Sequence, residues 1–186
     1  MKPVPRESLL DYVSYETERE RLRAAVMAIK APRRIHVGGV LTFLFENTAT
    51  IRYQVQEMMR AERIVREADI RHELETYNEL LGAPGELGCT LLIEIVDAEE
   101  RQKKLAEWNL LPAALYARLP NGTLVRAKVD TRQLGETRLS SVHYLKFDVR
   151  GQVPWAIGSD LAVLRVETEL SPANRTALGE DLASDL

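Results

Sequence analysis

The chain has 186 residues, of which 45% are hydrophobic and 28% are charged, a composition typical of a globular protein. Its 25 basic and 28 acidic residues give a net charge of -3, a balance that disfavours general binding to the phosphates of nucleic acids. The single cysteine, Cys89, excludes an internal disulfide and any iron–sulfur cluster held by this chain's cysteines alone.

The amino-terminal residues lack the apolar core of a signal peptide. No segment approaches the roughly 18 continuous apolar residues that a membrane span needs. We therefore expect a cytoplasmic protein without a membrane partner. The length favours a single α+β domain over residues 1–170, followed by a C-terminal tail over residues 171–186 that forms either one short helix or no fixed structure.

The first part of the chain predicts a helix and a β-hairpin. Ser14 is a candidate N-cap for a helix over residues 15–30, in which apolar residues recur at helical spacing. Residues 35–46 are rich in β-forming side chains, and Gly38-Gly39 within them favours a tight turn or a bulge. The run after the glycines is apolar on both faces, which indicates an interior strand.

The middle of the chain predicts a pair of helices followed by a buried strand. The first helix runs from Thr48 to about Arg66 with Asn47 or Thr48 as its cap, and the second spans residues 69–81. Glycine and proline residues end this helical region, and residues 89–96 form the next apolar β run.

The last part of the chain predicts further strands. The Asn121-Gly122 pair predicts a tight hairpin turn. Residues 141–149 alternate so that one face of the strand, which carries His143, is buried. Together these elements predict an α+β fold, with a mainly antiparallel sheet of about five or six strands and a helix pair packed on one face.

The apolar stripe on the first helix of the pair contains two polar side chains. At about 100° per residue, Gln54 and Glu62 fall within the arc that also holds Ile51 and Val55. An ionised carboxylate buried without a partner would cost several kcal/mol, so Glu62 is expected to be paired, protonated or bound to a ligand. Arg66 lies one turn further on and is the nearest partner on the helix.

The second helix and the buried strand supply further polar residues. We predict a ligand site with the members Gln54, Glu62, Glu73, Tyr77, Asn78 and His143. If the ligand is a divalent metal, the predicted ligating residues are Glu62, Glu73 and His143. The alternative is a structural network, in which Glu62 pairs with Arg66 and His143 is a hydrogen-bonded histidine at the strand end.

Two other patterns carry weaker alternatives. Asp69 and His72 have the acid-x-x-His spacing of carboxylate-bridged metal sites, although His72 projects to the solvent side of its helix. A group of arginines could bind an anion or RNA, or could form a solvated face balanced by neighbouring glutamates. This arginine cluster consists of Arg19, Arg21, Arg23, Arg33 and Arg34.

Several unusual runs of residues, taken in order, resemble a known family. They are Leu44-Phe45-Glu46-Asn47, residues 53–58 with Arg60-Ala61-Glu62, Tyr77-Asn78-Glu79-Leu80 and residues 141–147. They resemble an uncharacterised bacterial family catalogued only as a domain of unknown function, numbered thirty-five-oh-one. The resemblance implies no activity, but it implies a redox-associated accessory role. Genes of the family tend to lie beside those of rubrerythrin-like proteins and iron–sulfur oxidoreductases.

The leading hypothesis is a cytoplasmic accessory or binding protein. It would hold a redox partner protein, a small ligand or a metal through His143 and the helix face of residues 47–62. One alternative is a metal-dependent enzyme that uses Glu62, Glu73 and His143, and another is a nucleic-acid binder that uses the arginine cluster. The sequence identifies no cofactor, and it leaves open whether the protein is an enzyme and whether it forms an oligomer.

Overall fold

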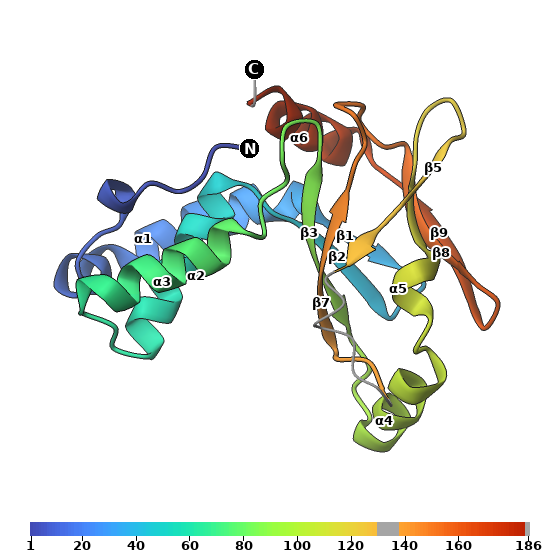
Figure 1. The fold of residues 1–186 in the computed structure, drawn as a ribbon, viewed down its shortest axis with the longest axis horizontal. Helices are drawn as coiled ribbons and strands as arrows, with labels where there is room; N and C mark the ends of the chain where they lie inside the picture. The colour runs from blue at the N-terminus through green and yellow to red at the C-terminus, as the bar shows by residue number, and fades with distance from the viewer. Residues whose placement is uncertain (130–137, 185–186) are drawn as a thin grey trace.

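The structure is a computed structural model that describes residues 1–129 and 138–184. The described residues confirm the α+β class, with helices beside antiparallel sheets (Figure 1). The helices are α1 (Tyr12–Lys30), α2 (Thr48–Ala61), α3 (Glu67–Asn78), α4 (Ala98–Glu107), α5 (Leu111–Ala114) and α6 (Pro172–Ala183), with the short 3-10 turns η1 (Arg6–Ser8) and η2 (Ala31–Arg33).

The described strands form two antiparallel sheets, of which the first, with five strands, agrees with the expected sheet and the second is additional. The first sheet has the order β1-β2-β3-β7-β6, and the second has the order β5-β4-β8-β9. The strands are β1 (Arg34–Val37), β2 (Leu41–Phe45), β3 (Leu87–Ile93), β4 (Leu115–Arg118), β5 (Leu124–Arg126), β6 (Lys128–Val129), β7 (Val142–Phe147), β8 (Ala156–Leu161) and β9 (Leu164–Glu169).

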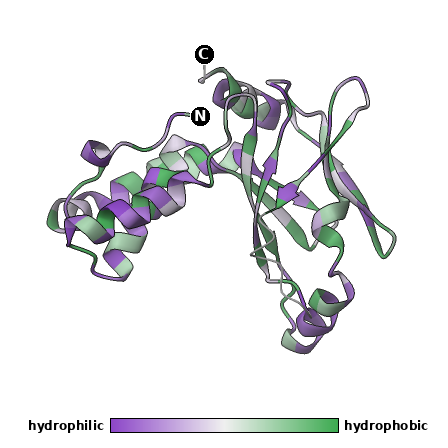
Figure 2. Ribbon diagram, viewed as in Figure 1, coloured by the Kyte–Doolittle hydropathy of each residue, from purple (hydrophilic) through white to green (hydrophobic). Residues whose placement is uncertain are grey.

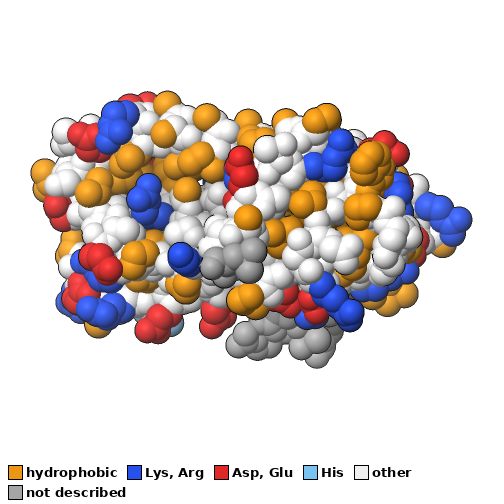
Figure 3. Space-filling view, turned by 90° about the horizontal axis from the view of Figure 1, so that it is seen from above, with side chains coloured by type: hydrophobic (Ala, Val, Ile, Leu, Met, Phe, Trp, Pro, Cys, Tyr) orange, Lys and Arg blue, Asp and Glu red, His pale blue; other side chains and the backbone are white. Residues whose placement is uncertain are grey.

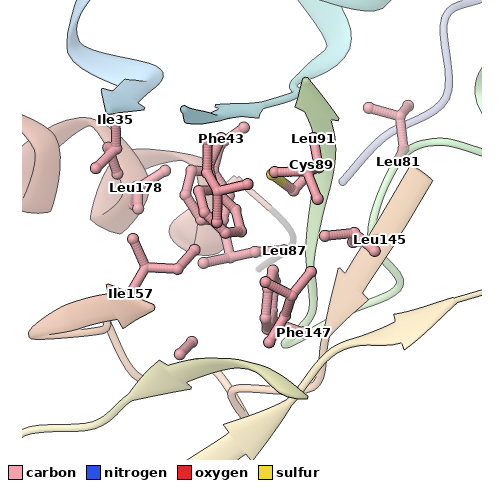
Figure 4. Packing of buried hydrophobic residues seen from close by; sticks show 14 of the residues in the cluster. Ile35, Phe43, Leu81, Leu87, Cys89, Leu91, Leu145, Phe147, Ile157 and Leu178 are labelled. Atoms are coloured by element: carbon pink, nitrogen blue, oxygen red, sulfur yellow. The ribbon is translucent and has the colours of Figure 1, made fainter. Parts of the chain in front are cut away.

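The two sheets enclose the main hydrophobic core. Strands β5 and β6 are separated only by Ala127, so the chain passes directly from the second sheet to the first. On the other side, the Thr168 hydroxyl of β9 donates a hydrogen bond to the His36 carbonyl oxygen of β1, at 3.1 Å. Side chains from both sheets, such as Phe147 and Ile157, meet in the space between them (Figure 4).

The hairpin between β1 and β2 confirms the expected glycine turn. Gly38 and Gly39 have φ angles of 61° and 75°, a backbone region that side-chain-bearing residues rarely adopt. A Cβ on Gly38 would also lie 2.8 Å from Cγ1 of Val166 on β9, so this glycine permits the close approach of the second sheet.

Capping residues fix where the first two helices begin. Asp11, and not the expected Ser14, caps α1, because its side chain accepts hydrogen bonds from the backbone N–H groups of Val13 and Ser14. Asn47 caps α2 as expected, and with Thr50 it forms a reciprocal capping box. The helices mix hydrophobic and hydrophilic residues along their length, consistent with one buried side (Figure 2).

Ion pairs and a hydrogen bond connect helices α1 and α2. Glu57 of α2 accepts two hydrogen bonds of 2.8 Å from the Arg19 guanidinium and one of 2.6 Å from the Tyr15 hydroxyl. Arg60 of α2 pairs with Glu16 of α1. The hydrogen bonds from Arg19, together with that from Tyr15, lower the pKa of the Glu57 carboxyl.

This lowered pKa predicts a pH-dependent stability. Because Glu57 has a lower pKa in the folded state than its ordinary value of 4.5, its pairing stabilises the fold above that value. The contribution is lost as the pH falls through the folded-state pKa. We expect Glu57→Gln to lower the free energy of unfolding by about 1–2 kcal/mol near pH 7, and by much less near pH 3.

Urea unfolding at both pH values measures this effect, and Glu99→Gln, at an exposed position of α4, is the matched control. A difference between wild type and Glu57→Gln that is the same at both pH values would contradict the prediction.

The residues after Ser171 form a helix, one of the two states that the sequence left open for the tail; residues 185 and 186 lie outside the described residues. Asp181 of α6 is buried and accepts hydrogen bonds of 2.7 and 2.9 Å from the Arg33 guanidinium, and one of 3.0 Å from the Asn47 side chain. This buried ion pair connects α6 to η2 and to the cap of α2.

The connection between α3 and β3 lies directly against the first sheet. A Cβ on Gly88 of β3 would overlap the Leu80 carbonyl oxygen and would lie 3.0 Å from the Gly82 backbone nitrogen. The Met1 ammonium donates a 2.8 Å hydrogen bond to the Gly82 carbonyl oxygen. The segment that follows α3 therefore packs directly on β3, and only glycine fits at position 88.

Candidate functional site

A pocket of about 280 Å³ lies between the helix pair and the outer face of the first sheet. That outer face includes Leu44, Thr90 and Tyr144, which lie opposite one another on β2, β3 and β7. The pocket is lined by Met58 and Glu62 at the end of α2, by Glu73, Thr76, Tyr77 and Leu80 on or after α3, and by Tyr144 of β7.

Tyr77 interacts with several polar groups at this pocket. Burial raises the pKa of its hydroxyl, a hydrogen bond with the Gln54 side chain acts in the opposite direction, and the charges of Tyr144, Glu73 and Glu62 raise it further. Three of the predicted residues, Glu62, Glu73 and Tyr77, therefore line one pocket, and Gln54 is a hydrogen-bond partner of Tyr77.

The expectation that Glu62 lies on the buried side of its helix is wrong, because its side chain is exposed. Helix α2 ends at Ala61, about five residues earlier than predicted, and Arg63 has a φ of 54°. The Ile64 N–H bonds to the Met59 carbonyl oxygen and the Arg63 N–H to that of Arg60, the pattern of a helix that ends in a left-handed residue.

The early end of α2 also removes the expected pairing of Glu62 with Arg66. The left-handed turn takes Arg66 out of helical register, and Arg66 becomes the residue that precedes α3. Among the described residues, neither Glu62 nor Glu73 forms an ion pair. Both glutamates therefore line the pocket without an ion-pair partner among residues 1–129 and 138–184.

His143 does not join the site. It lies on the core face of β7, opposite Leu91, and is fully buried. Its Nε2 lies 2.8 Å from the Ser140 carbonyl oxygen, burial lowers the pKa of the imidazole, and Nδ1 has no hydrogen-bond partner among the described residues. The neighbouring Tyr144 takes the position at the pocket that we predicted for His143.

The predicted metal site of Glu62, Glu73 and His143 is therefore not assembled. The two glutamates lie on the outer side of the first sheet, whereas His143 points into the core. Within residues 1–129 and 138–184, no three His, Cys, Asp or Glu side chains are grouped so that they could hold a metal ion. Asp69 and His72 are both exposed on α3.

Asn78 has a structural partner outside the pocket. Its side chain accepts a 2.8 Å hydrogen bond from the Val4 N–H and donates one of 3.1 Å to the Val4 carbonyl oxygen. Gln56 makes the same two-bond contact with the backbone of Leu10. These amides hold the amino-terminal segment against the helix pair, which explains their polarity without a ligand.

The arginine cluster is divided among separate partners. Arg19 pairs with Glu57, Arg21 pairs with Glu18, and Arg33 is buried against Asp181. On the face shown in Figure 3, basic and acidic side chains are interspersed. The cluster therefore does not form the continuous basic surface that nucleic-acid binding would use.

Cys89 is buried in the core (Figure 4), and in the first sheet it lies opposite Phe45 of β2. Burial, and then the charge of Glu46, raise the pKa of its thiol well above the ordinary value. A thiol in this state is a packing group and not a reactive one.

Comparison with known proteins gives a family and a fold relative. The family model described as "Protein of unknown function (DUF3501)" matches residues 3–182. A crystal structure of a protein of unknown function from Burkholderia pseudomallei is similar, with a TM-score of 0.89 and 29% identity, over 97% of this chain and 100% of that chain. No curated protein matches the chain. None of the described helices combines the length and apolar character required to cross a membrane.

Proposed function

The chain belongs to the DUF3501 family of proteins of unknown function, and we propose that it is a binding protein that holds a small organic cation between α2, α3 and β7. The observation that carries the proposal is the meeting of two unpaired carboxylates and two tyrosines at one pocket. Among the described residues that line it, none is basic.

The electrostatics of the pocket favour a cation. Glu62 and Glu73 supply negative charge from two different elements, and each carboxylate can accept a charge-assisted hydrogen bond. Tyr77 and Tyr144 add aromatic rings, whose faces attract an ammonium or a guanidinium group.

The apolar part of the lining favours an organic ligand over a bare ion. Met58 and Leu80 are half-buried and offer hydrocarbon surface beside the carboxylates. A volume of about 280 Å³ lies just below the usual range of ligand pockets, which favours a small ligand. A short alkylammonium or the end of a basic side chain would satisfy both the charged and the apolar groups.

The accessory role that the family resemblance implies is compatible with such a binding protein. Since Cys89 is buried with a raised pKa, a redox partner would have to supply the redox centre itself. A cytoplasmic location is part of this proposal, and it rests on the composition of the chain and its single cysteine.

Matched ligands test the proposal directly. Butylammonium and butyrate share a short alkyl chain and have opposite charge. Titrated into the isotope-labelled protein at constant ionic strength, butylammonium is expected to shift amide signals of α3 and Tyr144 saturably, and butyrate is not. Glu73→Gln should weaken butylammonium binding about tenfold, because one charge-assisted hydrogen bond is lost.

Glu75→Gln removes an exposed carboxylate from the same helix and is the control, because Glu75 does not line the pocket. Equal binding of butyrate, or equal weakening by Glu75→Gln, would refute a specific cation site.

A further inference from the structure

A second, polar pocket lies where α4 meets the beginning of β7, remote in sequence from the helix pair. Its volume is about 520 Å³, and it is lined by Arg101 and Gln102 of α4 together with Arg138, Ser140 and Ser141. No acidic side chain occurs among its described lining residues. Two arginines and two serines thus line one hollow on a chain whose net charge is negative.

Arg101 is held in position by backbone groups. Its Nη1 donates to the Ile95 carbonyl oxygen at 2.8 Å and also lies 3.4 Å from that of Val96. Within the part of the chain that the structure describes, Arg101 has no carboxylate partner. The remaining N–H groups of its guanidinium are therefore available as donors. Because the side chain is already ordered in the fold, binding a ligand would cost less conformational entropy.

The floor of this pocket is also fixed. The Leu139 N–H bonds to the Leu105 carbonyl oxygen, and the Ile93 N–H bonds to the Ser141 carbonyl oxygen. The side chains of Leu105 and Leu139 are buried beneath.

His143 adds a third link to this floor. A carbonyl oxygen can only accept, so Nε2 of His143 carries the proton that is donated to the Ser140 carbonyl oxygen, at 2.8 Å. The buried imidazole, which lies outside the first pocket, therefore has a role as a support for Ser140.

The Ser140 hydroxyl is oriented toward donation. Its oxygen accepts a 3.1 Å hydrogen bond from the Val142 N–H, which leaves its own proton for another acceptor. A ligand at this pocket would thus meet guanidinium and hydroxyl donors, the combination that recognises oxyanions.

We propose that the pocket between α4 and β7 binds a small oxyanion, such as a phosphate or carboxylate group, through Arg101, Arg138 and Ser140. The two guanidinium groups supply positive charge and paired N–H donors. Ser140, whose backbone is held by His143, adds its hydroxyl as a neutral donor. This site is separate from the proposed cation pocket and does not depend on it.

Titration with inorganic phosphate and with succinate, each balanced with sodium chloride to constant ionic strength, tests the proposal. We expect saturable shifts of the Gln102, Ser140 and Ser141 amide signals with one or both anions. A response to phosphate alone assigns the site to phosphoryl groups, and a response to succinate includes carboxylates. Arg138→Ala and Arg101→Gln should each weaken binding about tenfold or more.

Arg23→Ala removes the same charge from an exposed position of α1 and is the control. Arg138 is exposed, so its variant keeps the test decisive even if Arg101→Gln unfolds. Absence of a saturable response to both anions, retention of full affinity in Arg138→Ala, or equal weakening by Arg23→Ala would overturn the proposal.

Discussion

Gly88→Ala is expected to lower the free energy of unfolding by about 3 kcal/mol or more. The new Cβ would overlap the Leu80 carbonyl oxygen and press on the Gly82 backbone nitrogen. Both neighbours are backbone atoms, so no rotation of a side chain can relieve the overlap. The connection between α3 and β3 would have to move away from the sheet. This movement would displace Leu80, which lines the first pocket.

Chemical unfolding of the two proteins measures this change, and Gly179→Ala is the matched control. Gly179 lies inside α6, where a Cβ would meet only the Cγ2 atom of Val153, at 3.3 Å. In a helix interior, alanine is more favourable than glycine by about 1 kcal/mol. The free energy of unfolding of the control should therefore be unchanged or higher. Near-neutral Gly88→Ala would show that the connection is not held against β3 as described.

Asp181→Ala is expected to destabilise the fold by about 3–5 kcal/mol, because it leaves the guanidinium of Arg33 buried without its carboxylate. The pair is almost completely inaccessible, with side-chain exposures of 8% for Arg33 and 7% for Asp181. The Asn47 side chain would also lose an acceptor at the beginning of α2.

A double variant separates the cost of an unpaired charge from the value of the pair. Replacing Arg33 with methionine and Asp181 with leucine removes both charges and keeps apolar volume, so it should unfold at a higher urea concentration than Asp181→Ala. If the double variant were as unstable as Asp181→Ala, desolvation of Arg33 would not be the cause.

Features that depend on local chemistry could be predicted from the sequence. The Gly38-Gly39 turn and the Asn47 cap follow from residues that are adjacent in the chain. The assignment of His143 to a buried strand face was also correct, because alternation along one strand determines it.

The errors arose where the chain departs from residue preferences. Arg63 ends α2 in a conformation that usually takes glycine, so the sequence carries no signal for that end. The β8–β9 hairpin turns at Ala162-Val163 without glycine or asparagine, and the second sheet was consequently missed. The side of β7 that meets the helix pair depends on tertiary packing, and Tyr144 was therefore overlooked.

The buried pair of Arg33 and Asp181 also sets an order of events during synthesis. The two residues are 148 positions apart, and at about 5–20 residues per second the ribosome needs about 7–30 seconds to make the intervening chain. Helices α1 to α3 can associate early. The ion pair of Arg33 in η2 can form only after α6 has been made, and α6 follows every other described element. A nascent chain that stalls before α6 would lack the carboxylate that pairs with Arg33.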